Sequence, residues 1–540
     1  MSEENNNNNQ YEQPEREAEK TTQQATTVIA LTKAQFYTII GIACVAIIAA
    51  IIIAFVLGGN ANGGKNDGGN NDNGENAGNG STDGGDNTDG GDNTNGGENG
   101  ENSSCTHQGF EVICGDCGEV LLTEAGLYDA DNNLVASWET LKDEYGMKVD
   151  RNYSSFPYDD DFYKSDVSCP SYIFNNNPEL ENGVSLLLSD EVAFIGDLTF
   201  IDCNTIKSII IPEGVRSIGE NAFTACKNLK TVKIPSTVAV IGKAAFYQCE
   251  NLRSITIPYG VTSIKDSTFK ACERLESVSL PDSIISIESS AFSICRKLTD
   301  INIPDSVASL GVSAFYLCER LENIKIPDII TRIEAGLFSS CHSLKSIEIP
   351  SSVNYIGDEA FAFCKQIKSI TIPNGITSIK NGTFKSCTAL QTVSIPDSVQ
   401  SIGNYAFNSC ENLESIDIPE GVTSIGDYAF ERCGKIEAVT LPDGITSIGN
   451  GTFKYCSGLV SITIPHRVES IGDSAFVWCG NLTDITIPNS VKKIGRDVFF
   501  YSNNLTKIYY TGDKSSWAAI IIHESNEKLL STEIVYNFTP

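Results

Sequence analysis

Hydrophobic and polar residues repeat every 23 positions between residues 192 and 510. A phenylalanine marks each of fourteen units, from Phe200 to Phe499, and a cysteine follows it by three positions in the first thirteen, from Cys203 to Cys479. A proline recurs at the same period, from Pro212 to Pro488. A fixed period over so many copies is typical of a solenoid, because a unit of this size buries its apolar side chains only by stacking against its neighbours.

Each unit contains the signals of two short strands and one turn. The Leu-x-x-Ile-x-Ile stretch alternates as a strand does, and the proline after it cannot donate to a ladder and ends the strand. A Val-x-x-Ile stretch predicts a second, shorter strand; the glycine that often follows it suggests a positive φ there. The Phe-x-x-Cys segment is too short for a regular helix and suits a 3₁₀ or single helical turn. The sequence predicts a repeat solenoid of about 14 units over residues 184–510, with short parallel strands and irregular or 3₁₀ turns.

The unit closely resembles the BspA-type leucine-rich repeat, which reads approximately LxxIxIPxxVxxIGxxAFxxC. The resemblance covers the whole periodic stretch, from residue 192 to residue 510. It extends to a small cysteine-containing region at 105–183 and to a C-terminal cap at 511–540, where the units become irregular and Ser502 and Thr511 replace the expected Cys and Pro. The resemblance implies an array that binds other proteins, with adhesion to host proteins, matrix proteins or other microbes as the expected role.

Residues 34–57 contain no charged side chain and are almost wholly apolar from Ile39 onward. A helix of this length crosses a bilayer core of roughly 30 Å. A cleaved signal peptide is the alternative, but the 33-residue polar lead and the length of the apolar run favour a retained signal-anchor helix. Arg16, Lys20 and Lys33 precede the helix, so the positive-inside rule places residues 1–33 in the cytoplasm. The chain is therefore predicted to be a single-pass type II protein of the cell membrane, with its repeats outside the cell.

Residues 58–104 hold 16 Gly and 13 Asn in 47 positions and no apolar side chain larger than Ala. Such a segment cannot bury enough surface to offset its chain entropy, and we expect a disordered linker, as we do for the Asn-rich tail at 1–33. The formal charge of −31, with 69 acidic residues against 38 basic ones, argues against nucleic acid as a partner.

Four potential metal ligands lie close together in the sequence: Cys105, His107, Cys114 and Cys117. Three thiolates and one imidazole make a known structural zinc set, so one zinc ion is a candidate cofactor. Disulfides that include Cys169 are the alternative in an oxidising exterior. For the thirteen repeat cysteines we expect buried free thiols, because stacked side chains point in parallel and disfavour a disulfide.

Catalytic motifs are missing from the sequence, and His342, His466 and His523 are isolated. The chain is therefore not expected to be an enzyme, and no small-molecule substrate is evident. One predicted strand face carries a polar strip formed by Thr440, Thr463 and Thr486 with Ser461 and Asp484. The strip is a candidate surface for protein binding, although a solvated sheet face explains the threonines equally well.

The sequence thus favours a membrane-anchored extracellular repeat protein that binds other proteins or cell surfaces. A structural component of the cell envelope or surface layer, without a discrete ligand, is the alternative.

Overall fold

The computed structural model describes residues 125–128, 133–143, 183–190 and 192–540. The chain divides into two units, Met1–Gly100 and Glu101–Pro540, and all described residues belong to the second. The predicted cytoplasmic tail, the membrane helix at 34–57, the linker and the Cys105–Cys117 cluster lie outside the described residues. Within the described residues, no helix has the length and apolar character needed to cross a membrane.

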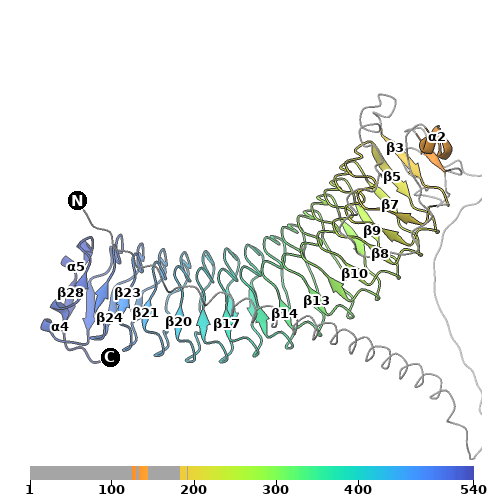
Figure 1. Cartoon of the computed structure of the whole chain (residues 1–540). Coiled ribbons are helices and arrows are strands. Elements are labelled where there is room, and N and C mark those ends of the chain that lie inside the picture. The colour runs from red at the N-terminus through yellow and green to blue at the C-terminus, as the bar shows by residue number, and fades with distance from the viewer. Residues whose placement is uncertain (1–124, 129–132, 144–182, 191) are drawn as a thin grey trace, which may run out of the picture. The chain divides into compact units, whose positions relative to one another are not determined.

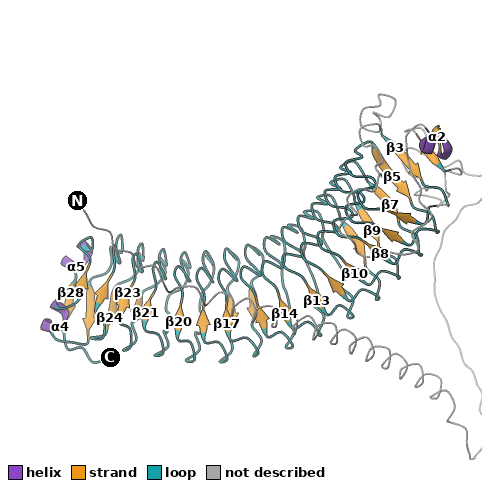
Figure 2. Cartoon of the chain, in the orientation of Figure 1, coloured by secondary structure: helices purple, strands orange, loops and turns teal. Residues whose placement is uncertain are grey.

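The repeats form a β-solenoid of coils stacked side by side, in which each coil offers a strand to one or both of two ladders (Figures 1 and 2). The first ladder comes from the Leu-x-x-Ile-x-Ile stretch and contains β3 (Val184–Leu187), β5 (Ile206–Ile210), β7 (Thr231–Lys233), β9 (Ser254–Thr256), β11 (Ser277–Ser279), β16 (Ser369–Thr371), β18 (Thr392–Ser394), β22 (Ser461–Thr463), β24 (Asp484–Ile487), β26 (Lys507–Tyr510) and β28 (Glu533–Val535). The second ladder comes from the Val-x-x-Ile stretch and contains β4 (Phe194–Ile195), β6 (Ser217–Ile218), β8 (Val240–Ile241), β10 (Ser263–Ile264), β12 (Ser286–Ile287), β13 (Ser309–Leu310), β14 (Arg332–Ile333), β15 (Tyr355–Ile356), β17 (Ser378–Ile379), β19 (Ser401–Ile402), β20 (Ser424–Ile425), β21 (Ser447–Ile448), β23 (Ser470–Ile471), β25 (Lys493–Ile494) and β27 (Ile521–Ile522).

Neighbouring coils of the array pair in parallel, mostly at an offset of one repeat, so equivalent positions lie side by side. In β9 and β11, for example, Ile255 lies opposite Val278. In five coils the expected first-ladder strand is not formed; these are the coils that contain Ile301, Ile324, Ile347, Ile416 and Val439. The same apolar residues remain buried there, with at most 8% of their surface exposed. The motif therefore determines which side chains are buried more strictly than which strands pair.

The glycine after the second strand is explained by close approach of two coils, and the expectation of a positive φ at that position is wrong. Among the described residues, no glycine that follows a second-ladder strand has a positive φ. A Cβ on Gly242 would instead lie 2.5 Å from the carbonyl carbon of Gly219 in the preceding coil. Larger residues occupy this position at Lys265, Glu288, Glu334 and Lys380. Pairing to the preceding second-ladder strand is interrupted at three of these four, Glu288 being the exception.

The segment around each marker phenylalanine is an irregular turn, and the described residues contain no 3₁₀ helix. The residues two positions before and two positions after the phenylalanine have a positive φ, as at Asn221 (54°) and Ala225 (60°). Their amides and that of Phe223 donate to carbonyls of the next coil, the Phe223 amide to Ala245 at 2.7 Å. Because alternate N–H groups bond to the neighbouring coil, the helical turn predicted from the sequence cannot form.

The core is one continuous column through the array. All fourteen marker phenylalanines are buried, and their rings stack on one another with centroids 5.1–5.8 Å apart. The Leu, Ile and Val residues of the two ladders and the repeat cysteines complete the same cluster. No coil has a core of its own, as expected of a unit this short.

Both ends of the described array are closed by elements outside the repeat. At the N-terminal end, β1 (Gly126–Tyr128) pairs antiparallel with β2 (Leu134–Ser137) and with β3, and α2 (Trp138–Asp143) follows β2. At the C-terminal end, α4 (Lys514–Ala518) and α5 (Glu527–Leu530) alternate with β27 and β28. The strands among these terminal elements extend the ladders beyond the repeats, with β2, β27 and β28 as the last strands of their sheets.

Candidate binding surfaces

The predicted polar strip lies on the first ladder, where Ser461 and Thr463 of β22 pair with Asp484 and Thr486 of β24. Thr440 occupies the equivalent position one coil earlier, in a coil without a first-ladder strand. Thr440, Ser461 and Thr463 are exposed and Asp484 is half-buried, but only 7% of the Thr486 surface is exposed. The structure therefore brings four of the five predicted residues together as a solvent-facing strip.

The C-terminal tail ends this strip. Tyr509 of β26 lies next to Thr486 in the ladder, and its ring packs against Phe538 with centroids 4.6 Å apart. The Phe538 amide donates to the Tyr510 carbonyl at 3.0 Å, which holds the tail beside the last strands. The exposed strip thus stops at Asp484 and is narrower than the sequence predicts.

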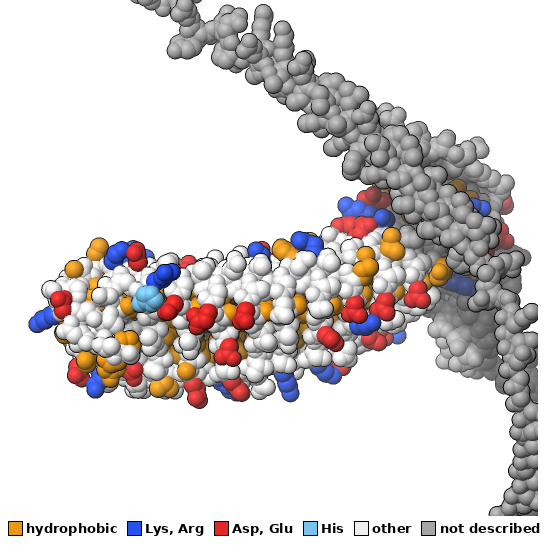
Figure 3. Space-filling model, turned by 90° about the horizontal axis from the view of Figure 1, so that it is seen from below, with side chains coloured by type: hydrophobic (Ala, Val, Ile, Leu, Met, Phe, Trp, Pro, Cys, Tyr) orange, Lys and Arg blue, Asp and Glu red, His pale blue; other side chains and the backbone are white. Residues whose placement is uncertain are grey.

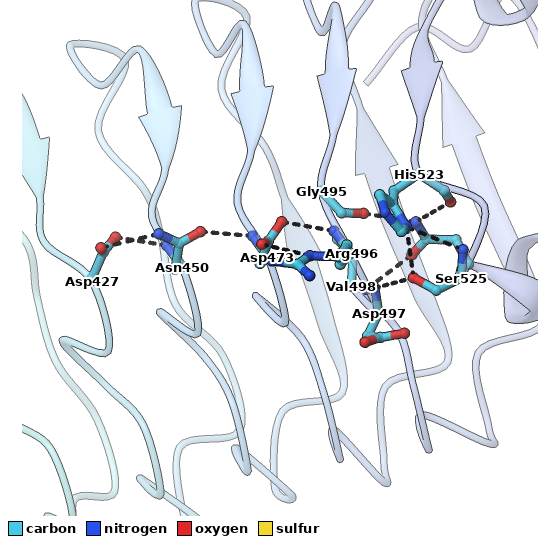
Figure 4. Close-up of polar contacts among 10 residues, drawn as sticks. Asp427, Asn450, Asp473, Gly495, Arg496, Asp497, Val498, His523 and Ser525 are labelled. Carbon is cyan, nitrogen blue, oxygen red and sulfur yellow. Dashed lines mark hydrogen bonds and ion pairs between the residues drawn. The ribbon is translucent and has the colours of Figure 1, made fainter.

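A ladder of Asp and Asn side chains runs along the later coils, from Asp358 onward, at the position three residues before the marker phenylalanine. Its later members are Asp427, Asn450 and Asp473, and each side-chain oxygen accepts a hydrogen bond from the backbone amide one coil on, at 2.7–2.8 Å (Figure 4). The last acceptor, Asp473, receives the Arg496 amide and, at 3.3 Å, the Arg496 guanidinium. The bond from the Arg496 amide is the main reason that the pKa of Asp473 lies below its ordinary value. The ladder fixes the spacing of the coils and leaves little of its polar capacity for a ligand.

Beyond Arg496, residues of the cap take over this role (Figure 4). Asn526 accepts a hydrogen bond from the Val498 amide at 2.9 Å and donates one to the Gly495 carbonyl at 2.7 Å. Ser525 accepts from the Asp497 amide and lies 3.0 Å from His523 Nδ1. His523 therefore belongs to the C-terminal cap, where its neighbours Ser525 and Asn526 already form hydrogen bonds with backbone groups of the last coil.

The thirteen repeat cysteines are free, buried thiols, which confirms the prediction for them. Twelve of them, Cys226 to Cys479, donate Sγ–H to the carbonyl of the marker phenylalanine one coil back, at 2.9–3.2 Å. Burial raises the pKa of Cys387 and Cys456 to about 12. Since the thiolate is the reactive form, these cysteines are unsuited to nucleophilic chemistry or metal binding.

Ser502, which departs from the repeat, performs the same task as a cysteine. It is fully buried, and its hydroxyl donates to the Phe476 carbonyl at 2.6 Å. Thr511, in the place of the repeat proline, accepts from the Asn489 amide at 2.9 Å. Both departures near the end of the array keep a polar contact between coils.

The predicted zinc ligands Cys105, His107, Cys114 and Cys117 lie outside the described residues. Within the residues that the structure does describe, no group of three His, Cys, Asp or Glu side chains could hold a metal ion. His342 is half-buried and its pKa is lowered mainly by desolvation, while His466 forms an exposed contact of 3.3 Å with Asp443. These histidines come from separate coils and form no common centre.

A second surface, which the sequence analysis missed, is formed by outward-facing side chains of the turns around the marker phenylalanines in the later coils. We call it the aromatic edge and define it by Tyr405, Tyr428, Tyr455, Trp478 and Tyr501. Tyr405 and Tyr428 stand two residues before their marker phenylalanines and stack at 5.1 Å. Tyr455, Trp478 and Tyr501 stand two residues after theirs and stack in series at 6.2 and 4.5 Å. The signal was available in the sequence as aromatic residues at two fixed distances from the marker, but the positive φ at those positions was not.

Charges on the described array are mixed. The face shown in Figure 3 carries both acidic and basic side chains, with several Asp and Glu along the middle of the array, and hydrophobic side chains are scattered among them. Surface ion pairs link neighbouring coils, such as Lys265 with Glu288 at 3.0 Å and Lys492 with Glu469 at 2.7 Å. A surface of this kind offers no continuous basic field of the type that nucleic acid requires.

Three overlapping stretches, residues 167–285, 262–391 and 377–506, match the family model described as the BspA type leucine-rich repeat region, in 6 copies. Together they span more than half of the 540-residue chain. No curated protein matches the chain.

The chain is also similar to solved bacterial structures. A leucine-rich repeat protein from Bacteroides ovatus shares 31% identity with it over 65% of this chain and 83% of that one, with a TM-score of 0.49. A leucine-rich cell surface protein from Faecalibacterium prausnitzii shares 30% identity over 62% and 81%, with a TM-score of 0.33. A leucine-rich repeat protein from T. pallidum shares 25% identity over 34% and 78%, with a TM-score of 0.27.

Proposed function

Since the chain belongs to the BspA-type leucine-rich repeat family, whose arrays are a non-enzymatic protein-interaction fold, we propose that it displays its array outside the cell to bind other proteins. The observation that carries this proposal is the single shared core. Because the Phe column and the ladder residues bury their side chains along the whole array, the outward positions of every coil remain free to vary. They form continuous rows on a rigid support, which suits contact with a large partner.

We also propose that residues 34–57 form a retained helix that anchors the chain in the cell membrane. The uncharged apolar run is long enough to span a bilayer, and the bases that precede it favour a cytoplasmic N-terminus. The Gly- and Asn-rich stretch at 58–104 then serves as a spacer between the membrane and the array. Purified mature protein whose N-terminus begins after residue 57 would contradict the retained anchor.

We further propose that Cys105, His107, Cys114 and Cys117 hold one structural zinc ion. The donor set suits zinc, and four ligands this close in the sequence can reach one tetrahedral ion without help from the array. Elemental analysis of the purified chain should give about one zinc per chain. A metal-free chain whose mass is lower by the hydrogens lost in disulfides would refute this site and support pairing that involves Cys169.

Binding to proteins is tested with the full chain in detergent micelles, against immobilised fibronectin, fibrinogen and laminin, with serum albumin as the reference for non-specific adsorption. Saturable binding to at least one of the three, above that to albumin, supports an adhesive role. If no probe is bound saturably, the chain acts instead as a structural component of the envelope or surface layer. That alternative then predicts regular lateral assembly of the chain on a membrane, which electron microscopy of reconstituted vesicles would reveal.

A further inference from the structure

We propose that the aromatic edge, with Lys385 and Arg432, is the docking surface for the partner. The partner is a folded protein that presents a carboxylate to Arg432 and an apolar patch to Trp478. This inference rests on the proposed function and gives it a location on the array.

The aromatic edge gathers exposed aromatic side chains in neighbouring coils, whereas exposed apolar side chains elsewhere, such as Tyr259 and Ile285, stand apart in the sequence. Between 40% and 47% of the surfaces of Tyr405, Trp478 and Tyr501 is exposed, and Phe500 beside Tyr501 is 51% exposed. The Phe500 ring meets the Tyr501 ring edge to face, with centroids 4.3 Å apart. Tyr and Trp are the side chains most often found at the energetic centre of protein interfaces.

Stacking holds these side chains in place before any partner arrives. Tyr455, Trp478 and Tyr501 form one series, and the Arg432 guanidinium lies 5.4 Å from the Tyr455 centroid at its start. Their backbone is fixed as well, because amides of the same turns bond to the next coil, the Tyr455 amide to Val477 at 2.8 Å. A surface whose rotamers are already fixed loses less conformational entropy on binding than a flexible one.

Cations connect the tyrosines before the phenylalanines to those after them. Gly382 and Gly451 occupy the positions equivalent to Tyr405 and Tyr428 in the coils before and after them, and a Cβ on Gly451 would lie 2.4 Å from the Tyr428 ring. Lys385 lies 5.6 Å from the Tyr405 centroid, and Lys454 lies 5.9 Å from that of Tyr428. Lys454 also lies 5.4 Å from the Tyr455 centroid, so the tyrosines before and after the phenylalanines form one surface.

The three cations Lys385, Arg432 and Lys454 differ in whether an acidic side chain pairs with them. Lys454 pairs with Glu431 at 3.7 Å, whereas Lys385 and Arg432 form no ion pair in the described part of the chain. Arg432 is exposed, and its contact with the Tyr455 ring, at 5.4 Å from the centroid, uses none of its N–H groups as donors to an oxygen. A carboxylate is the group that an arginine binds best, through two parallel hydrogen bonds. Charge complementarity therefore points to an acidic side chain on the partner.

The arrangement of the rings favours a protein over a glycan. Neutral sugars bind aromatic residues through exposed ring faces, but here the rings stack on each other, which covers the faces between them. A polyanionic glycan is disfavoured because Asp427 and Glu431 lie in the same turn as Arg432. Tyr, Trp and Arg with surrounding Ser, Asn and Gly is the composition of antibody combining sites, which recognise protein surfaces. The polar strip on β22 and β24 has no large aromatic residue and is the weaker candidate.

The test uses the full chain in detergent with the same immobilised fibronectin, fibrinogen and laminin. Trp478→Ala and Arg432→Glu are compared with matched controls elsewhere on the array, Tyr259→Ala (74% exposed) and Arg467→Glu. Ser461→Ala with Thr463→Ala tests the polar strip. Circular dichroism melts must match those of the parent chain, which the exposed position of all these residues favours.

We expect Trp478→Ala and Arg432→Glu each to weaken binding about tenfold or more, while both controls and the polar-strip variant bind as the parent does. Arg432→Glu should also reduce the salt dependence of binding. Loss in the polar-strip variant with retention in the edge variants would overturn the inference and leave the proposed function standing. Binding that disappears after enzymatic deglycosylation of the probe, or self-association of the parent that Trp478→Ala abolishes, would replace the protein partner by a glycan or by a second copy. If the parent binds no probe saturably, the proposed function fails and the inference with it.

Discussion

Replacing Phe361 by alanine tests the shared core most directly. Its side chain is fully buried in the middle of the array, and its ring lies 5.8 Å from Phe338 and 5.7 Å from Phe384. The substitution removes the transfer free energy of a buried phenylalanine and leaves a cavity, which typically costs about 3–5 kcal/mol. The free energy of unfolding should fall by about that amount.

Phe499 is the matched comparison at the end of the same column. It is as buried as Phe361, with 1% of its surface exposed, so the cavity should cost nearly as much. Among the described residues it stacks on one ring only, that of Phe476 at 5.7 Å, and an aromatic pair contributes roughly 0.5–1.5 kcal/mol beyond burial. Phe499→Ala should therefore be about 1 kcal/mol less destabilising than Phe361→Ala.

Denaturant melts followed by circular dichroism measure both changes. Because coupling runs only between neighbouring coils, the loss at Phe361 should also broaden the transition or divide it into two steps. No shift of either midpoint would show that the ring column is not the shared core, and equal destabilisation by the two substitutions would refute the contribution of ring stacking.

Three further outcomes are expected. With a thiol reagent under native conditions, the thirteen repeat cysteines should stay unmodified, so that at most five of the 18 cysteines react before unfolding; more would contradict the buried ladder. Gly242→Ala should destabilise the chain by about 1–3 kcal/mol, because its Cβ would meet the preceding coil at 2.5 Å, whereas Gly480→Ala, with nothing within 4 Å, should be neutral in the same melts. Hydrogen bonds from the Ser516 amide and neighbouring hydroxyls lower the pKa of Asp513 to about 2, so its capping of α4 is present above pH 4 and is lost as the pH falls through about 2. The protection of the α4 amides, measured as exchange relative to the intrinsic rate at each pH, should fall over that interval, and a flat protection profile would refute the cap.

The buried half of the fold could be predicted from the sequence because burial and spacing are both periodic. The Phe column, the cysteine thiols and the parallel pairing of strands one repeat apart all follow from equivalent positions stacking on one another. Even Ser502 fits this logic, since a hydroxyl can replace a thiol as donor to the same carbonyl.

What could not be predicted are the features that depend on backbone conformation. A positive φ is usually inferred from glycine, but here Ile294 adopts 65° and Trp478 adopts 59°. Inter-coil hydrogen bonds hold these residues in a region that their side chains disfavour. The same bonds turn the expected 3₁₀ segment into an irregular turn, and close approach of backbones explains the glycines for which a positive φ was expected. Periodicity shows that a position recurs with the same residue type, but it does not show whether a positive φ or a close backbone contact is the cause.

The polar strip and the aromatic edge show how this limit affects the interpretation of function. Strand alternation predicts the polar strip and places its side chains correctly on the ladder. It cannot detect that the C-terminal tail and Tyr509 end the exposed strip at Thr486. The residues of the aromatic edge have a positive φ. Strand alternation therefore does not predict the direction of their side chains.

Because every coil must repeat the same buried residues, differences between coils are confined to outward positions, and a cluster of unlike outward residues is where a repeat protein can encode a specific contact. The turns of the earlier coils, up to that of Phe338, carry no aromatic residue and no Arg at the positions of the aromatic edge, where Ala225, Gln248 and Leu317 are examples. Those of the later coils carry Tyr, Trp and Arg. Stability alone does not require this contrast, since alanine adopts the same turn. The aromatic residues of the last coils therefore expose apolar surface to water without a gain that stability requires. A binding role would explain why they are there.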